Sequence, residues 1–117
     1  MFTDRELDLM GVLWEHGPSL VADVRAALSD QLAYTTVLTV LRTLESKEYV
    51  SHEEDGRGHR YFAIVQQQAA RKSALSHLTD KLFKGSAELM FAHLVSDQKL
   101  TAEQIKRMRK LLADKEK

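Results

Sequence analysis

The chain has 117 residues, of which 44% are hydrophobic, and equal numbers of acidic and basic residues, a composition typical of one compact domain or two small lobes. It contains no cysteine, which excludes disulfides, thiolate metal sites and cysteine redox sensing. No apolar run reaches the roughly 18 residues of a membrane span, and the N-terminus lacks the pattern of a signal peptide, so we expect a cytoplasmic protein without membrane insertion.

The first predicted element is a helix over residues 4–16. Thr3 and Glu6 have the spacing of a capping box, in which each side chain bonds a free backbone N–H group at the start of the helix. Apolar residues then recur at helical spacing, namely Leu9, Met10, Leu13 and Trp14. Gly17 and Pro18 end the helix, because glycine adopts the left-handed conformation and proline cannot continue a helix.

Two further amphipathic helices follow. The second is short and has one apolar face, formed by Val21, Val24, Ala27 and Leu28. The third spans residues 34–47 and has a core-facing stripe, formed by Val37, Val40, Leu41 and Leu44.

Short aromatic and β-branched runs predict a β-hairpin after the third helix. Residues 49–53 and 60–65 are the two strands, and residues 55–58 form the turn between them. Three helices followed by a hairpin are the layout of a winged helix-turn-helix, in which the hairpin is the wing. We therefore predict a mostly α fold with a small β-hairpin wing, and a DNA-binding domain over residues 1–65.

Residues 66–117 are helical in pattern and are predicted to form a dimerisation domain. One helix spans residues 66–83. Gly85 and Ser86 end it and can cap a second helix that contains residues 89–95, and the last helix begins with a capping box at Thr101 and Gln104. Their stripes hold more apolar surface than a small monomer easily conceals, so we expect a homodimer. The predicted dimer contacts are Leu75, Leu78, Leu82, Phe83, Leu89, Leu94, Ile105, Met108, Leu111 and Leu112.

The outward face of the third helix is the predicted DNA contact, because a helix-turn-helix places its second motif helix in the major groove. Besides Leu38, this face carries short hydroxyls and one long cation, namely Thr35, Thr36, Thr39, Arg42, Thr43 and Ser46. Hydroxyls contact bases or phosphates, threonine methyls suit the thymine methyl, and arginine can bridge guanine O6 and N7 or bind the backbone. The alternative is a solvated helix face, but threonine is a poor helix former, so its clustering needs a further reason.

The hairpin turn offers a second DNA contact, at Arg57, His59 and Arg60. A flexible turn with two glycines suits a phosphate or the minor groove. Arg57 is the stronger candidate, because Arg60 could instead pair with Glu53 or Glu54 across the hairpin. The alternative is an ordinary solvated turn.

No pattern of a catalytic or cofactor site is present. The five histidines have no close i, i+4 pair and no companions at metal-ligand spacing, so we expect structural or surface histidines. Nucleophile-elbow, P-loop and dinucleotide motifs are absent, so we expect neither enzyme activity nor a cofactor. A winged helix used as a protein-interaction module is the alternative function, and exposed apolar residues on the third helix would be its signature.

Charge is unevenly distributed along the chain. Residues 1–65 hold 6 basic and 11 acidic side chains, a net charge of −5, and residues 66–117 hold 11 and 6, a net charge of +5. An acidic DNA-binding half is unfavourable, because basic side chains supply most non-specific DNA affinity. We therefore expect Arg42 and Arg57 on the groove side with the carboxylates behind them, and an operator affinity that depends on salt and on dimerisation.

Several segments resemble the BlaI/MecI penicillinase-repressor family. They are residues 6–10, 12–14 and 17–18, and above all Ala33-Tyr34-Thr35-Thr36-Val37-Leu38-Thr39-Val40-Leu41. Residues 82–86 and 100–103 are also similar to the family. The resemblance implies a homodimeric repressor that binds palindromic operators in double-stranded DNA and controls genes of the β-lactam-resistance type. It also implies release from DNA when a membrane-bound sensor protease triggers proteolysis of the repressor.

Three positions depart from the family pattern. Glu48 lies where the family often has glycine after the third helix, and a left-handed conformation there would cost about 1 kcal/mol relative to glycine. The usual Arg-Arg pair late in this helix is Arg42-Thr43, which removes one contact and implies a different operator preference. The Asn-Phe bond that is cut in the best-known members aligns with His93-Leu94, so that cleavage site is not carried over.

Overall fold

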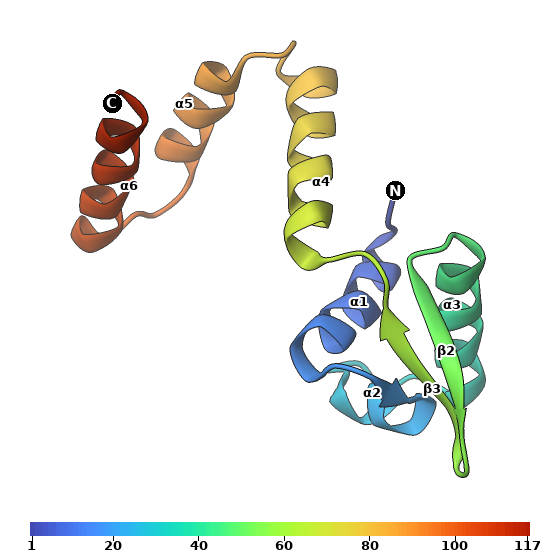
Figure 1. Cartoon of the computed structure of the whole chain (residues 1–117). Coiled ribbons are helices and arrows are strands. Elements are labelled where there is room, and N and C mark those ends of the chain that lie inside the picture. Colours follow the sequence, from blue (N-terminus) through green and yellow to red (C-terminus); the bar gives the residue numbers. More distant parts are fainter. The chain divides into compact units, whose positions relative to one another are not determined.

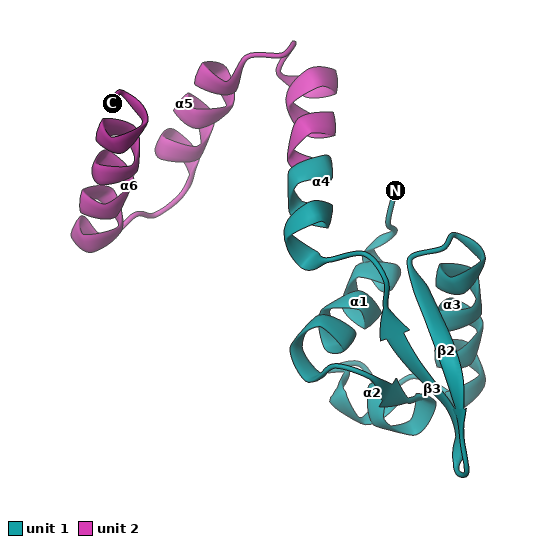
Figure 2. Cartoon of the chain, viewed as in Figure 1, with its two compact units in different colours: residues 1–74 teal, residues 75–117 magenta.

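A computed structural model describes all 117 residues of the chain. The chain divides into two compact units, residues 1–74 and residues 75–117 (Figure 2). Helix α4 (Gln67–Leu82) contributes its first half to the first unit and its second half to the second. The functional boundary at residue 65 stays a prediction.

The first unit has the element order of a winged helix (Figure 1). It contains α1 (Asp4–His16), β1 (Ser19–Leu20), α2 (Val21–Ala27), α3 (Tyr34–Ser46), β2 (Val50–Asp55) and β3 (Gly58–Ala63). The β2–β3 hairpin is the predicted wing, and Figure 1 shows its turn extending beyond α2 and α3. The predicted mostly α fold with a hairpin wing is confirmed.

Helix α1 begins and ends where the sequence predicts. Thr3 Oγ1 accepts the backbone N–H of Glu6 at 3.1 Å, and Glu6 Oε1 accepts the backbone N–H of Thr3 at 2.7 Å, which completes the capping box. At the other end, Gly17 has a φ of 79° and donates its N–H to the carbonyl of Leu13. Glycine adopts this positive φ without the steric cost of a Cβ atom.

The sheet has three antiparallel strands in the order β1-β3-β2, one strand more than the sequence predicts. Strand β1 has two residues, too few to produce an alternating pattern of apolar and polar side chains. Its residues pair with Tyr61 and Arg60, so β3 is the central strand. Strand β2 pairs with β3 along its whole length, from Val50 to Asp55.

One hydrophobic core joins the three helices to the sheet. Its buried side chains are Leu9, Met10, Val12, Leu13, Val21, Val24, Val37, Leu41, Leu44, Val50 and Tyr61. Of the predicted stripes, Trp14, Leu28 and Val40 are half-buried at the edge of this core, and Ala27 is exposed at the end of α2. The expectation that Leu38 lies on the outward face of α3 is wrong, because its side chain is half-buried against the same core.

The second unit contains the second half of α4, then α5 (Ala87–Asp97) and α6 (Ala102–Lys115). Both predicted helix starts are confirmed: Ser86 Oγ accepts the N–H of Leu89 at 3.0 Å, and Thr101 and Gln104 form a capping box. Met90 is the only buried side chain of this unit, so most of its apolar residues are exposed. None of the chain's helices has both the length and the apolar character that a membrane crossing requires.

Candidate DNA interface

The outward face of α3 is open to solvent. All six predicted DNA contacts on this helix are exposed, namely Thr35, Thr36, Thr39, Arg42, Thr43 and Ser46. The opposite side of the helix is closed by Val37, Leu41 and Leu44, each 0% exposed. The helix is therefore anchored by one side and available on the other, as a helix that enters the major groove must be.

Two threonines on this face have a fixed hydroxyl orientation. Thr39 Oγ1 donates to the carbonyl of Thr35 at 2.8 Å, and Thr43 Oγ1 donates to the carbonyl of Thr39 at 3.0 Å. These two side chains thus offer methyl groups and oxygen lone pairs rather than a free O–H donor. The methyl groups suit contacts with the thymine methyl, and the hydroxyls of Thr35 and Thr36, which bond nothing within the chain, can still donate.

Arg42 is the only basic side chain of α3, and it takes part in none of the chain's ion pairs. Its guanidinium lies beside the hydroxyl of Tyr61. Burial raises the pKa of that hydroxyl and the nearby Glu45 carboxylate adds to the effect, whereas Arg42 partly offsets it. The tyrosine therefore stays neutral at physiological pH and does not form an ion pair with Arg42, whose guanidinium is available to an acceptor outside the chain.

At the turn of the wing, Arg57 is exposed and loosely held. Its Nε atom lies 3.7 Å from Asp55 Oδ1, and its side chain is 73% exposed. Asp55 Oδ1 also accepts the backbone N–H of Arg57 at 3.1 Å, and Gly58 has a φ of 136°, which L-residues with a side chain rarely adopt. These two features shape a turn that presents the guanidinium of Arg57 to solvent.

Arg60, in contrast, is held within the first unit. Its Nη2 and Nε atoms donate to Asp55 Oδ2 at 2.7 and 3.2 Å, and Nη1 donates to the carbonyl of Pro18 at 3.4 Å. Arg60 thus pairs within the hairpin, as the sequence allowed, but its partner is Asp55, which the turn fixes, and not the exposed Glu53 or Glu54. The hydrogen bonds from Arg60, and then the one from the Arg57 backbone, lower the pKa of Asp55.

The sequence does not reveal a histidine pair on the wing, one member of which contacts α3. Nδ1 of His52 lies 2.6 Å from Glu45 Oε2, and the ring of His52 stacks on the ring of His59, with centroids 4.3 Å apart. His59, a predicted DNA contact, is exposed, whereas His52 is half-buried. Only the register of β2 on β3 brings the two rings together, so no spacing in the sequence could have indicated the pair.

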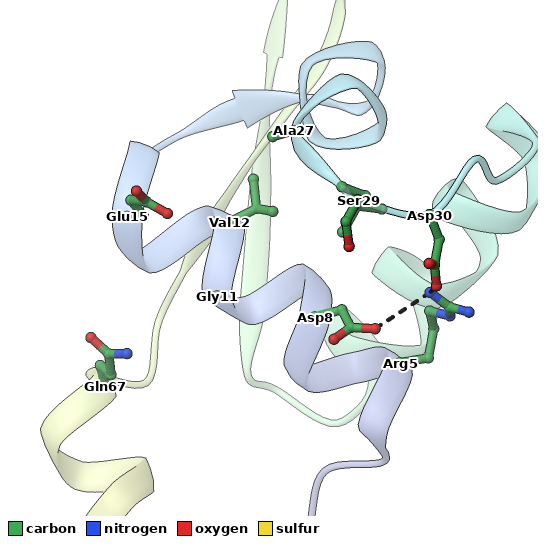
Figure 3. Close-up of a pocket in the computed structure, with 10 residues that line it drawn as sticks. Arg5, Asp8, Gly11, Val12, Glu15, Ala27, Ser29, Asp30 and Gln67 are labelled. Atoms are coloured by element: carbon green, nitrogen blue, oxygen red, sulfur yellow. Dashed lines mark hydrogen bonds and ion pairs between the residues drawn. The ribbon is translucent and has the colours of Figure 1, made fainter.

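Three carboxylates of the first unit line a hollow beside α1. Asp8 and Glu15 of α1 and Asp30 of the α2–α3 link lie around this hollow (Figure 3). Arg5 bridges two of them, with Nη1 at 3.3 Å from Asp8 Oδ2 and 2.8 Å from Asp30 Oδ2. Three of the eleven carboxylates of residues 1–65 therefore lie at this hollow, whereas Glu45 lies on α3 near Arg42.

A profile of the penicillinase repressor family matches residues 2–114 of the chain. The chain belongs to the penicillinase repressor family. It is 32% identical to the transcriptional regulator BlaI of Mycobacterium tuberculosis over 97% of this chain and 83% of that protein. It is also 22% identical to the penicillinase repressor of Bacillus licheniformis, over 96% of this chain and 89% of the relative. The resemblance found in the sequence is therefore confirmed.

Among solved structures, the chain is similar to the reduced form of MarR from E. coli. The TM-score is 0.52 at 16% identity, and the match covers 97% of this chain and 76% of MarR. The oxidized form of MarR matches with a TM-score of 0.51 at 15% identity, over 97% of this chain and 74% of that one. These likenesses concern the fold, and they agree with the winged-helix assignment.

One departure from the pattern of penicillinase repressors is visible at the end of α3. Glu48 has a φ of 66°, in the left-handed region where the family often has glycine. Its N–H donates to the carbonyl of Glu45 at 2.9 Å, and the N–H of Tyr49 donates to the carbonyl of Leu44 at 3.0 Å. This is the Schellman pattern of hydrogen bonds, with glutamate at the position that favours glycine.

The residues expected to pair two copies of the chain are mostly exposed within one copy. Leu75, Leu78, Leu82, Leu89, Leu94, Ile105, Leu111 and Leu112 are exposed, and Phe83 and Met108 are half-buried. The ring of Phe83 packs against His93, with centroids 5.5 Å apart. A unit with so few buried side chains has little core of its own, and its exposed apolar residues are of the kind that an interface covers.

Proposed function

We propose that the chain is a homodimeric, sequence-specific DNA-binding transcription repressor of the cytoplasm. The observation that carries the proposal is the exposed outer face of α3, on which four threonines, a serine and Arg42 lie opposite a fully buried apolar side. Family membership supports the same function, since the relatives are a transcriptional regulator and a penicillinase repressor.

In this proposal α3 lies in the major groove and the wing lies along the adjacent backbone. Arg42 and Thr36 contact base edges, and the methyl groups of Thr39 and Thr43 contact thymine methyls. Arg57 contacts a phosphate or the minor groove, because its guanidinium is exposed at the tip of the wing. Arg60 contributes indirectly by fixing Asp55 and the turn.

The dimer forms through α4, α5 and α6, whose apolar side chains lack cover in one chain. A two-fold dimer requires a palindromic operator, with half-sites about one or more helical turns apart. The positive charge of residues 66–117 adds to the attraction for DNA in the dimer.

The proposals for the target genes and for the release signal rest on the resemblance to the family and not on the geometry of the site. A relative is named methicillin resistance regulatory protein MecI, from Staphylococcus aureus, and is 18% identical over 94% of this chain and 91% of its own length. We therefore propose genes of the β-lactam-resistance type as targets, and a membrane-bound sensor protease as the partner that ends repression.

A protein-interaction module is the competing function, and the surface of α3 argues against it. Such a module needs exposed apolar side chains on this helix, yet Leu38 packs against the core. Tyr34, which is 47% exposed, is the one large hydrophobic residue left on the surface of α3. A single aromatic at the helix end is a small patch for a protein partner.

Selection from a pool of randomised DNA duplexes tests the proposed function. The full chain at pH 7.5 is expected to enrich one inverted repeat, and the enriched duplex should bind far more tightly than a shuffled duplex of the same composition. Enrichment of no sequence, or equal affinity for both duplexes, would contradict sequence-specific DNA binding.

A further inference from the structure

The histidine pair of the wing is anchored at one end and open at the other. His52 is held by the carboxylate of Glu45 on α3 through the contact of 2.6 Å. Its ring lies nearly parallel to that of His59, with an interplanar angle of 14°. The side chain of His59 is 43% exposed, so the outer ring of the stack faces solvent on the wing.

The charged groups around the pair come from α3 and from the hairpin. On the α3 side, Glu45, Arg42 and Tyr34 lie close enough to the hydroxyl of Tyr61 to act on it electrostatically. The ring centroid of Tyr61 lies 5.2 Å from that of His52 and 6.5 Å from that of His59. On the hairpin side, Glu54 Oε1 lies 3.9 Å from His59 Nε2.

The two rings differ in the carboxylates that lie near them. A proton on His52 is neutralised by Glu45 at hydrogen-bond distance. A second proton, on His59, would face the first across stacked rings, and its nearest carboxylate belongs to Glu54, whose side chain is 87% exposed. A well-solvated carboxylate at that distance stabilises a cation weakly, whereas like charges in contact repel each other.

We propose that His59, which stacks on His52 and through it is linked to Glu45, binds a phosphate of the DNA backbone when its imidazole is protonated. Operator affinity therefore increases as the pH falls. The inference rests on the proposed function, because it places the wing on the DNA backbone beside α3. A phosphate beside His59 stabilises the protonated imidazole by a charge-assisted hydrogen bond, so binding takes up a proton. By linkage, a complex that binds more protons than its free components is favoured at lower pH.

The test compares the affinity of the full chain for the duplex selected at pH 7.5, measured by fluorescence anisotropy at pH 7.5 and pH 6.0. The wild type is expected to bind about tenfold more tightly at pH 6.0. The slope of log K against the logarithm of the salt concentration should also become steeper at pH 6.0, by about one unit per subunit. A steeper slope is the signature of a gained phosphate contact. His59→Gln should lose both changes, so that the ratio of its affinities at the two pH values is close to one.

Two further variants make the test specific. His16→Gln is the matched control, because His16 is 54% exposed and lies 4.0 Å from Glu15, much as His59 lies beside Glu54. This control should keep both changes. His59→Lys, which is charged at both pH values, should bind at pH 7.5 as tightly as the wild type does at pH 6.0.

The failures of the two proposals are distinguishable. A wild type that binds the duplex with the same affinity at both pH values, or a His59→Gln variant that keeps the pH dependence, would overturn the role of His59 and leave DNA binding intact. Failure of the wild type to select or bind any duplex at pH 7.5 would overturn the repressor proposal and this inference with it.

Discussion

The Nζ atom of Lys47, directly after α3, lies 2.8 Å from Oε2 and 3.0 Å from Oε1 of Glu6 in α1. Glu6 is only 3% exposed, and its Oε1 atom also accepts the capping hydrogen bond from the backbone of Thr3. Burial alone would raise the pKa of this carboxyl, but the hydrogen bonds from Lys47 and Thr3 outweigh burial and lower the pKa. One carboxylate thus caps α1 and fixes the end of α3, the helix proposed to contact DNA.

Because the pKa of Glu6 is lower in the folded chain than in the unfolded chain, its ion pair stabilises the fold above the unfolded pKa and is lost as the pH falls through the folded pKa. Glu6→Gln should therefore destabilise the chain at pH 7 by about 1–2 kcal/mol. Urea unfolding at pH 7 and pH 3 measures this, and the difference between wild type and variant should shrink at pH 3. Glu15→Gln, at an exposed position of the same helix, is the control and should have little effect. A difference that is equal at both pH values would contradict the ionic role.

The left-handed conformation of Glu48 predicts that replacing it by glycine, the residue that the family often has there, stabilises the chain. Glu48→Gly removes the Cβ atom from a residue with a φ of 66° and should raise the free energy of unfolding by about 1 kcal/mol. Glu48→Ala keeps the Cβ atom, so it should bring no such gain. Thermal unfolding of the three proteins checks the order, and an alanine variant as stable as the glycine variant would show that the backbone strain is absent.

Placing a charge on α6 should separate the two copies of the proposed dimer. Leu111 is 70% exposed in one chain, so Leu111→Glu should leave the fold unchanged but bury an unpaired carboxylate in the dimer interface. We expect a monomer by sedimentation at micromolar concentration and at least a tenfold loss of operator affinity. Leu7→Glu, at an exposed leucine of α1 outside the proposed interface, should stay dimeric. A Leu111→Glu dimer with unchanged affinity would contradict the role of α6.

Local signals in the sequence were sufficient for most of the fold. The capping boxes at Thr3 and Thr101 and the left-handed Gly17 place helix ends correctly, because each depends on residues within one turn of the helix. The side of α3 that faces the core follows from the spacing of its apolar residues. The half-buried Leu38 shows, however, that the buried face of the helix is wider than a strict i, i+3, i+4 pattern predicts.

Contacts that depend on three-dimensional register could not be predicted. Strand β1 gains its structure from pairing with β3 and not from its own two residues. The partner of Arg60 and the stacking of His52 on His59 both depend on which side chains share a face of the hairpin, which the register of the strands decides. The Glu6–Lys47 pair joins positions that are far apart in the sequence, so no local pattern indicates it.

Selection of DNA duplexes by Thr36→Ala, Arg42→Ala and Arg57→Ala tests the central claim most directly. The two α3 variants should lose preference at particular base positions, and Arg42→Ala should cost about 1–3 kcal/mol at the position that the arginine contacts. Arg57→Ala should select the wild-type motif with uniformly weaker affinity, as the loss of a backbone contact predicts. If both α3 variants select the wild-type motif with wild-type strength at every position, α3 does not contact the bases and the proposed function is wrong.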